Sequence, residues 1–126
     1  MSTIGHPLSD LVNMTTPYHM LETSAYNKDV AAYRDGATPG LPTCKQLVAW
    51  YAEVAGWDPS PDMTWGIAFH FFRATCIFQG IAARYAVRQA SSALAKANGE
   101  QRHMMGKIAW ECVQAVQASA KAKHKL

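Results

Sequence analysis

The longest apolar stretch of the chain constrains its fold more than any other feature. It runs from about Met63 to Gln89 and reads MTWGIAFHFFRATCIFQGIAARYAVRQ. Its apolar side chains do not alternate with polar ones, and they spread around most of a helical circumference. We therefore predict a central, buried helix of roughly 40 Å at 1.5 Å per residue. Small residues that would let neighbouring backbones come close are Gly66, Gly80, Ala82 and Ala83.

The same stretch is a poor candidate for a membrane span. His70, Arg73 and Arg84 interrupt it, and a membrane span tolerates few charges. The first residues show neither the basic nor the apolar region of a signal peptide. The three cysteines make neither a disulfide framework nor a CxxC metal pair. We predict no membrane association and a reducing, cytoplasmic location.

Shorter helices are predicted on both sides of this stretch. Pro7 suits the first position of a helix from Leu8 to about Thr16, which stops before Pro17. Asp10 then meets the positive end of the helix dipole. Residues 17–42 are punctuated by proline and glycine and are expected to be irregular.

A second short helix is predicted after this irregular segment. Thr43 is a good cap for it, and Gly56 ends it. Its apolar face carries Leu47, Val48, Tyr51, Val54 and Ala55. A last helix runs from about Gln101 to Ser119, after a looser link. Clean strand patterns are nearly absent, so we predict an all-α helical bundle at residues 1–120 and a basic tail at 121–126.

The charge of the chain is divided unevenly along its length. Residues 1–72 hold three Lys/Arg and seven Asp/Glu, whereas residues 73–126 hold nine and two. A basic second half could face phosphate, nucleic acid or an acidic partner, although solvated helix faces explain it as well. The aromatic side chains fall at helical spacings and are not interleaved with basic residues on one surface. We predict no nucleic-acid binding.

Motifs that carry chemistry are scarce in this sequence. The histidines are scattered, and HExxH, GxSxG, GxxxxGK[ST] and GxGxxG are all missing. We predict no catalytic residue and no metal ligand, and we interpret His70 as a core histidine. Arg73 lies inside the apolar stretch, with Gln79 further along it. Two readings of Arg73 stay open: a buried ion pair, for example with Asp10, or contact with a substrate. Asp10, Arg73 and Gln79 are the candidate substrate-binding residues.

Four stretches in this order resemble the C-terminal part of the aminoglycoside phosphotransferase/choline-kinase-like family. They are STIGHPLSDL, GLPTCKQLVAWYAEVAG, FHFFRATCIFQGIAARYAVRQASSALA and IAWECVQ. They cover about residues 2–118 and are most similar to the branch also found fused to acyl-CoA dehydrogenases. His6 departs from the pattern, because many members have Asp in a GDP triplet there. The resemblance implies that these helices correspond to the C-terminal lobe of a protein-kinase-like fold.

The resemblance also implies a function for the full-length relatives. They would use ATP and magnesium to transfer phosphate to a hydroxylated small molecule. The family's HGD…N loop and DWE triplet do not occur in this chain, and a segment like STIGHPLSDL follows the DWE triplet in this branch. We therefore expect Met1 to correspond to an internal methionine of a truncated phosphotransferase-like protein. We expect this chain alone to have no kinase activity and no cofactor.

An alternative function is a stand-alone helical protein-interaction module. Apolar helix faces that stay exposed would imply self-association or a partner that covers them.

Overall fold

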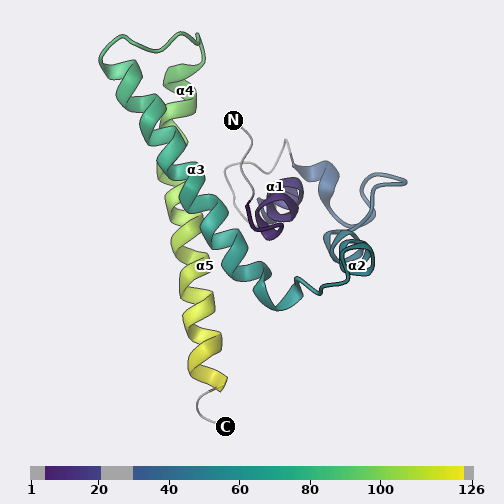
Figure 1. Cartoon of the computed structure of the whole chain (residues 1–126). Coiled ribbons are helices and arrows are strands. Elements are labelled where there is room, and N and C mark those ends of the chain that lie inside the picture. Colours follow the sequence, from purple (N-terminus) through teal and green to yellow (C-terminus); the bar gives the residue numbers. More distant parts are fainter. Residues whose placement is uncertain (1–4, 21–29, 124–126) are drawn as a thin grey trace. The chain divides into compact units, whose positions relative to one another are not determined.

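The computed structural model describes residues 5–20 and 30–123 (Figure 1). All regular structure within these ranges is helical, which confirms the predicted all-α fold class. The correspondence with a kinase lobe stays a prediction. The chain divides into two compact units, Met1–Ile67 and Ala68–Leu126, which are described separately.

The first unit contains α1 (Leu8–His19), η2 (Ala31–Tyr33), α2 (Cys44–Ala55), η3 (Ser60–Asp62) and the start of α3 (Met63–Ala86). The prediction that α1 stops before Pro17 is wrong, because the helix continues three residues past Thr16. Proline lacks an amide proton and removes one helical hydrogen bond. Nearby, the hydroxyls of Thr15 and Thr16 donate to helix carbonyls, at 3.0 Å to Leu11 and 2.9 Å to Val12. These two side-chain hydrogen bonds lie in the same part of α1 in which Pro17 removes a backbone hydrogen bond.

Helix α2 begins and ends where the sequence predicts. The Gln46 amide donates to Thr43 Oγ1 at 3.2 Å, and the Thr43 amide donates to Gln46 Oε1 at 2.8 Å, which forms a capping box. Gly56 ends the helix with a φ of 65°, the left-handed conformation that glycine adopts at low cost. The predicted apolar face is covered only in part, since Val48 is buried but Val54 is 89% exposed.

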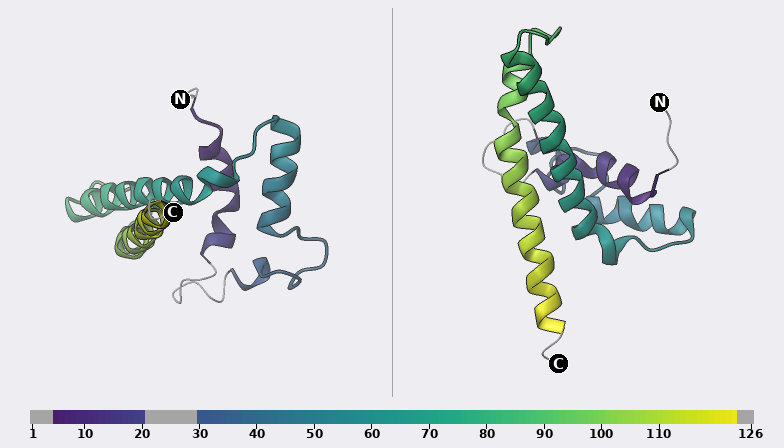
Figure 2. Two further views of the ribbon diagram at one scale, coloured as in Figure 1. Left: turned by 90° about the horizontal axis from the view of Figure 1, so that it is seen from below. Right: turned by 60° about the vertical axis from the view of Figure 1, so that its left-hand side comes forward.

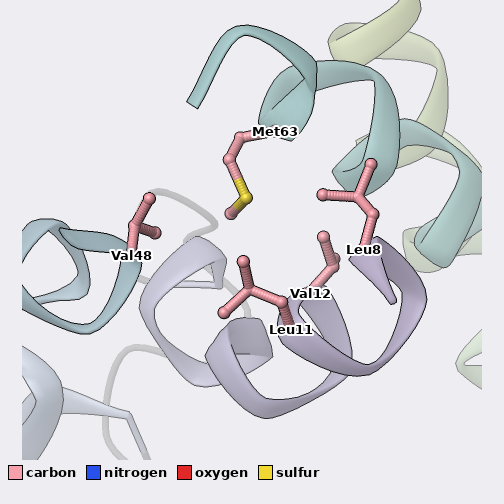
Figure 3. Packing of buried hydrophobic residues seen from close by; sticks show 5 residues of the cluster. All are labelled: Leu8, Leu11, Val12, Val48 and Met63. Carbon is pink, nitrogen blue, oxygen red and sulfur yellow. The ribbon is translucent and has the colours of Figure 1, made fainter. Parts of the chain in front are cut away.

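The core of the first unit joins α1, α2 and the first turn of α3 (Figure 3). Its buried members are Leu8, Leu11, Val12, Val48 and Met63. Burying one such side chain contributes about 1.5–3 kcal/mol. Partly buried side chains that pack against this core are Cys44, Tyr51, Trp57 and Ile67. The core therefore fixes the start of α3 relative to α1 and α2.

The second unit is a helical hairpin. After the rest of α3 come α4 (Ala95–Glu100) and α5 (Arg102–Lys123), and α5 runs back alongside α3 (Figures 1 and 2). A Cβ at Gly106 of α5 would lie 3.5 Å from Thr75 Cγ2, so the two helices are in contact. A Cβ at Gly99 of α4 would lie 3.0 Å from both Cα and Cβ of Ala82. Helix α4 was not predicted. It occupies the place of the expected looser link.

Of the four predicted close approaches along α3, two are present, the one at Gly80 is not, and Ala83 is exposed. Gly66 lies against α1, and Ala82 lies against Gly99 of α4. A Cβ at Gly80 would have only Arg84 Nη1 nearby, at 3.8 Å, so the expectation for Gly80 is wrong. Helix α5 continues through Lys123, so residues 121–123 of the predicted tail are helical, whereas 124–126 lie outside the described residues.

The prediction that α3 is buried on nearly every side is also wrong. Phe72 is 58% exposed and Ile77 is 55% exposed, although Phe71, directly before Phe72, is fully buried. Within the hairpin α3 packs against α4 and α5. Because these two helices cover only one side of α3, side chains on its other side stay exposed to solvent. By length and composition alone, the helical stretch Ser60–Ala86 is apolar enough to cross a membrane.

Candidate functional site

An open pocket lies in the first unit at the start of α1. Among the described residues its lining is His6, Leu8, Asp62 and Trp65. Its volume is about 340 Å³, at the lower end of the range for small-molecule pockets. Leu8 is buried, whereas the other three side chains are exposed. Two separate segments build the pocket: the start of α1 with His6 before it, and the junction of η3 with α3.

His6 is held in place by two contacts. Its Nδ1 accepts a hydrogen bond from the Leu8 amide at 3.2 Å, and its ring meets Trp57 edge-on with centroids 5.4 Å apart. The amides in the first turn of a helix have no intrahelical acceptor, so this bond satisfies one of them. An Asp at this position could accept the same i→i+2 bond in an Asx turn. His6 therefore has a structural role at the start of α1.

The junction between η3 and α3 is shaped by Asp58. Its Oδ1 accepts a hydrogen bond from the Ser60 amide at 2.9 Å. Hydrogen bonds from the side chain and the backbone of Ser60 lower the pKa of the Asp58 carboxyl, because they favour its charged form. This turn leads the chain into Asp62 and Trp65, and it thereby sets one side of the pocket.

The pocket has limited chemical capability. Its described lining offers one carboxylate, one imidazole and one indole. Phosphate is usually bound by arginine, lysine or a set of backbone amides, and catalysis by a nucleophile needs a hydroxyl or thiol beside a base. The lining supplies neither set. Sequence reasoning missed this pocket, because the only local signal was a histidine and a proline directly before a helix.

The three predicted substrate-binding residues are all exposed. Asp10 lies in the first turn of α1, as predicted. Arg73 and Gln79 lie on α3, six residues apart, which places them about 120° apart around the helix rather than on one face. The reading of Arg73 as a buried ion pair is wrong, because its side chain is exposed. Asp10 belongs to the first unit and the other two belong to the second.

His70 is half-buried on α3. Its ring meets Phe71 edge-on with centroids 5.3 Å apart. Burial lowers the pKa of His70, and the positive charge of Arg73 lowers it further. Both effects favour the neutral form of the His70 imidazole, as expected for a histidine that packs within the hairpin.

A second polar cluster surrounds Tyr18 at the end of α1. Its hydroxyl donates to the Pro42 carbonyl at 2.7 Å, and its ring meets Tyr33 edge-on at 5.2 Å. Burial raises the pKa of the nearby Cys44 thiol, with a further contribution from Asp35. A reactive cysteine needs a lowered pKa, so Cys44 is not an activated nucleophile.

Metal binding has no support within residues 5–20 and 30–123. No group of three or more His, Cys, Asp or Glu side chains there is arranged to hold a metal ion.

The described part of the chain is thus all-helical, and its pocket holds no recognisable reaction centre. Comparison with known proteins narrows the class. No protein-family model matches the chain, and no solved structure matches it. The chain is 29% identical over 113 residues to acyl-CoA dehydrogenase family member 10 of Mus musculus, which covers 88% of this chain and 10% of that protein.

Similar values hold for acyl-CoA dehydrogenase family member 11. The identity is 31% over 93 residues with the Rattus norvegicus protein and 30% over 93 residues with the Homo sapiens protein. Each match covers 73% of this chain and 12% of the relative. The chain thus spans about a tenth of the length of the curated relatives that it matches.

Proposed function

We propose that this chain forms the helical part of a phosphotransferase domain of the aminoglycoside phosphotransferase/choline-kinase-like family. The observation that carries the proposal is the ordered set of four sequence stretches from STIGHPLSDL to IAWECVQ. That resemblance points to the branch found fused to acyl-CoA dehydrogenases. The names of the relatives, acyl-CoA dehydrogenase family members 10 and 11, support this assignment.

The role of the helices would be to form a wall beside the reacting groups. Phosphoryl transfer depends on positioning carboxylates, a bound metal ion and a nucleotide cradle. The pocket beside α1 has a lining of a different chemistry, so we propose that this chain alone does not transfer phosphate. In a complete domain, ATP and magnesium would be bound by residues that the HGD…N and DWE motifs supply. Asp10, Arg73 and Gln79 are exposed, and each stays a proposed contact to the acceptor.

Nucleotide binding tests this proposal without knowledge of the acceptor. We would compare the purified chain with a fusion that adds the segment preceding the matched region in the Mus musculus relative. Magnesium with ATP should raise the melting temperature of the fusion and leave that of the chain alone unchanged. The added segment by itself is the control.

The two possible failures are distinct. ATP-dependent phosphorylation of a small molecule by the chain alone would refute its inactivity. A fusion that is helical by circular dichroism but gives no nucleotide-dependent stabilisation would refute the family assignment.

A second candidate function, a helical interaction module, is favoured by the exposed apolar side chains of α3. Phe72 and Ile77 are each more than half exposed. Helix α3 is the most apolar helix of the chain, yet these side chains face water. Such exposed apolar groups indicate a surface that another molecule covers.

A further inference from the structure

The outward face of α3 in the second unit carries a regular apolar stripe, here called the outer seam. It consists of Phe69, Phe72, Cys76, Gln79 and Ala83. All five are exposed, and their spacing of three and four residues in alternation is that of a heptad seam. On a straight helix they fall within an arc of about 80°. A narrow stripe of this kind fits the ridge of one other helix.

Helix α5 of the same hairpin shows what a solvated face looks like. Its outward positions at the same alternating spacing are His103, Lys107, Trp110, Gln114, Gln117 and Lys121, and all are exposed. Five of these six side chains are polar, whereas four of the five in the outer seam are not. The two sets of positions belong to helices of the same hairpin and are compared at the same spacing of three and four residues. The outer seam is therefore a property of α3 and not of exposed helices in this unit generally.

Positive charge lines one edge of the outer seam. Arg73 and Arg84 are exposed and lie eleven residues apart, which is three helical turns and puts them on the same side of α3. Helix α3 contains no aspartate or glutamate. Charges beside a heptad seam select the partner, because opposite charges attract across the interface. A second copy of α3 would offer no carboxylate to either arginine, so self-association through this face is disfavoured.

The charge of the whole second unit has the same sign. Residues 73–126 hold nine Lys/Arg and two glutamates, Glu100 and Glu111. Glu111 lies 3.8 Å from Lys107 in an ion pair on α5. An acidic partner would therefore be attracted at a distance as well as at contact.

From the seam and its charged edge we infer that the outer seam docks an amphipathic helix of a partner protein. That helix carries apolar side chains at heptad spacing and acidic side chains along the edge that meets Arg73 and Arg84. A lipid surface is the less suitable occupant. Helices that lie on membranes combine a broad apolar face with many basic residues, whereas the seam includes Gln79 and α3 carries only Arg73 and Arg84. The inference does not depend on the phosphotransferase assignment.

Two synthetic helical peptides test the inference against the full chain. Both have leucine at heptad positions, and they differ only in having glutamate or lysine at the flanking positions. We expect the acidic peptide to bind at least about tenfold more tightly than the basic one in fluorescence anisotropy. The double variant Arg73→Glu/Arg84→Glu should reverse this preference. The matched control Lys107→Glu/Lys121→Glu makes the same charge change on α5, and this variant should still bind the acidic peptide more tightly than the basic one.

A third variant, Phe72→Ser, tests the apolar contact and should weaken binding of the acidic peptide about tenfold or more. If Phe72→Ser does not fold, the charge variants still decide, because both arginines are exposed. Equal binding of the two peptides, or the same effect from the α5 control as from the α3 variant, would overturn the inference. So would binding to phosphatidylserine vesicles in place of the peptide, or a dimer that Phe72→Ser dissociates.

Discussion

Gly66 of α3 lies directly against Leu8 of α1. A Cβ at Gly66 would be 2.9 Å from both Cγ and Cδ2 of Leu8, and 3.0 Å from Val12 Cγ2. Real side chains do not come this close. The first unit therefore brings α3 onto α1 only because position 66 has no side chain.

Replacing Gly66 by alanine should destabilise the first unit. Alanine gains about 1 kcal/mol of helix propensity over glycine, but the added methyl group must displace Leu8 and Val12, and overpacking costs about 1–3 kcal/mol. We expect a net loss of about 1 kcal/mol in urea unfolding. Gly80→Ala is the matched control, because a Cβ there would meet only Arg84 Nη1, at an ordinary contact distance of 3.8 Å, and it should gain up to about 1 kcal/mol. Equal effects of the two variants would contradict the packing argument.

His6 should stabilise the start of α1 through its bond to the Leu8 amide. His6→Ala removes the acceptor and should lower the free energy of unfolding by about 1 kcal/mol, as for the loss of a helix cap. His6→Asp should retain most of the stability that His6→Ala loses, because an aspartate can accept the same amide hydrogen bond. Thermal unfolding by circular dichroism would measure both. If His6→Asp were as unstable as His6→Ala, the hydrogen bond would not be the reason for the histidine.

Arg88 adopts a backbone conformation that suits glycine. Its φ is 56°, and it ends α3 in a Schellman motif in which the Gln89 amide donates to the Arg84 carbonyl at 2.8 Å. A left-handed conformation costs a residue with a Cβ about 1–2 kcal/mol. Arg88→Gly should therefore stabilise the hairpin by about 1 kcal/mol in chemical denaturation. Gln89→Gly, where φ is not positive, serves as the control and should give no gain.

The stability of the hairpin should fall as the pH is lowered below about 6.5 because of His70. Its pKa is lowered in the folded chain by burial and by Arg73, so the unfolded chain binds the proton more readily. The stabilising contribution is complete above the unfolded pKa of about 6.5 and is lost as the pH falls toward the folded pKa. Unfolding between pH 8 and pH 5 would measure the slope. His70→Gln should flatten it. Arg73→Gln should raise the pKa of His70 in an NMR titration, and an unchanged pKa would exclude the proposed influence of Arg73.

Cys44 should be alkylated more slowly than Cys76. Burial raises the pKa of the Cys44 thiol and limits access to it, whereas Cys76 is exposed on α3. Iodoacetamide at pH 8, followed by peptide mass spectrometry, would give both rates in the same sample. Faster modification of Cys44 would show that α2 opens from the core of the first unit.

The two ends of α2 were the most predictable part of this protein. Thr43 and Gln46 form a cap within four residues, and Gly56 supplies the left-handed turn that ends α2. Such signals act locally and need no tertiary contact. The all-α class followed from the same local periodicity. Pro17 shows the limit, because a proline in the last turns of α1 costs one hydrogen bond and does not end the helix.

The sequence by itself determined that helices form in the regions of α1, α2, α3 and α5, the two caps of α2 and the position of Asp10 in the first turn of α1. Only the tertiary structure decided that Phe71 is buried while Phe72, the next residue, is exposed. It also decided that Arg73 faces solvent and that His6, Asp62 and Trp65 line one pocket. The physical reason is that helical propensity depends on neighbours along the chain. Burial depends on which distant segments lie against a given face, and no periodicity within one helix specifies them.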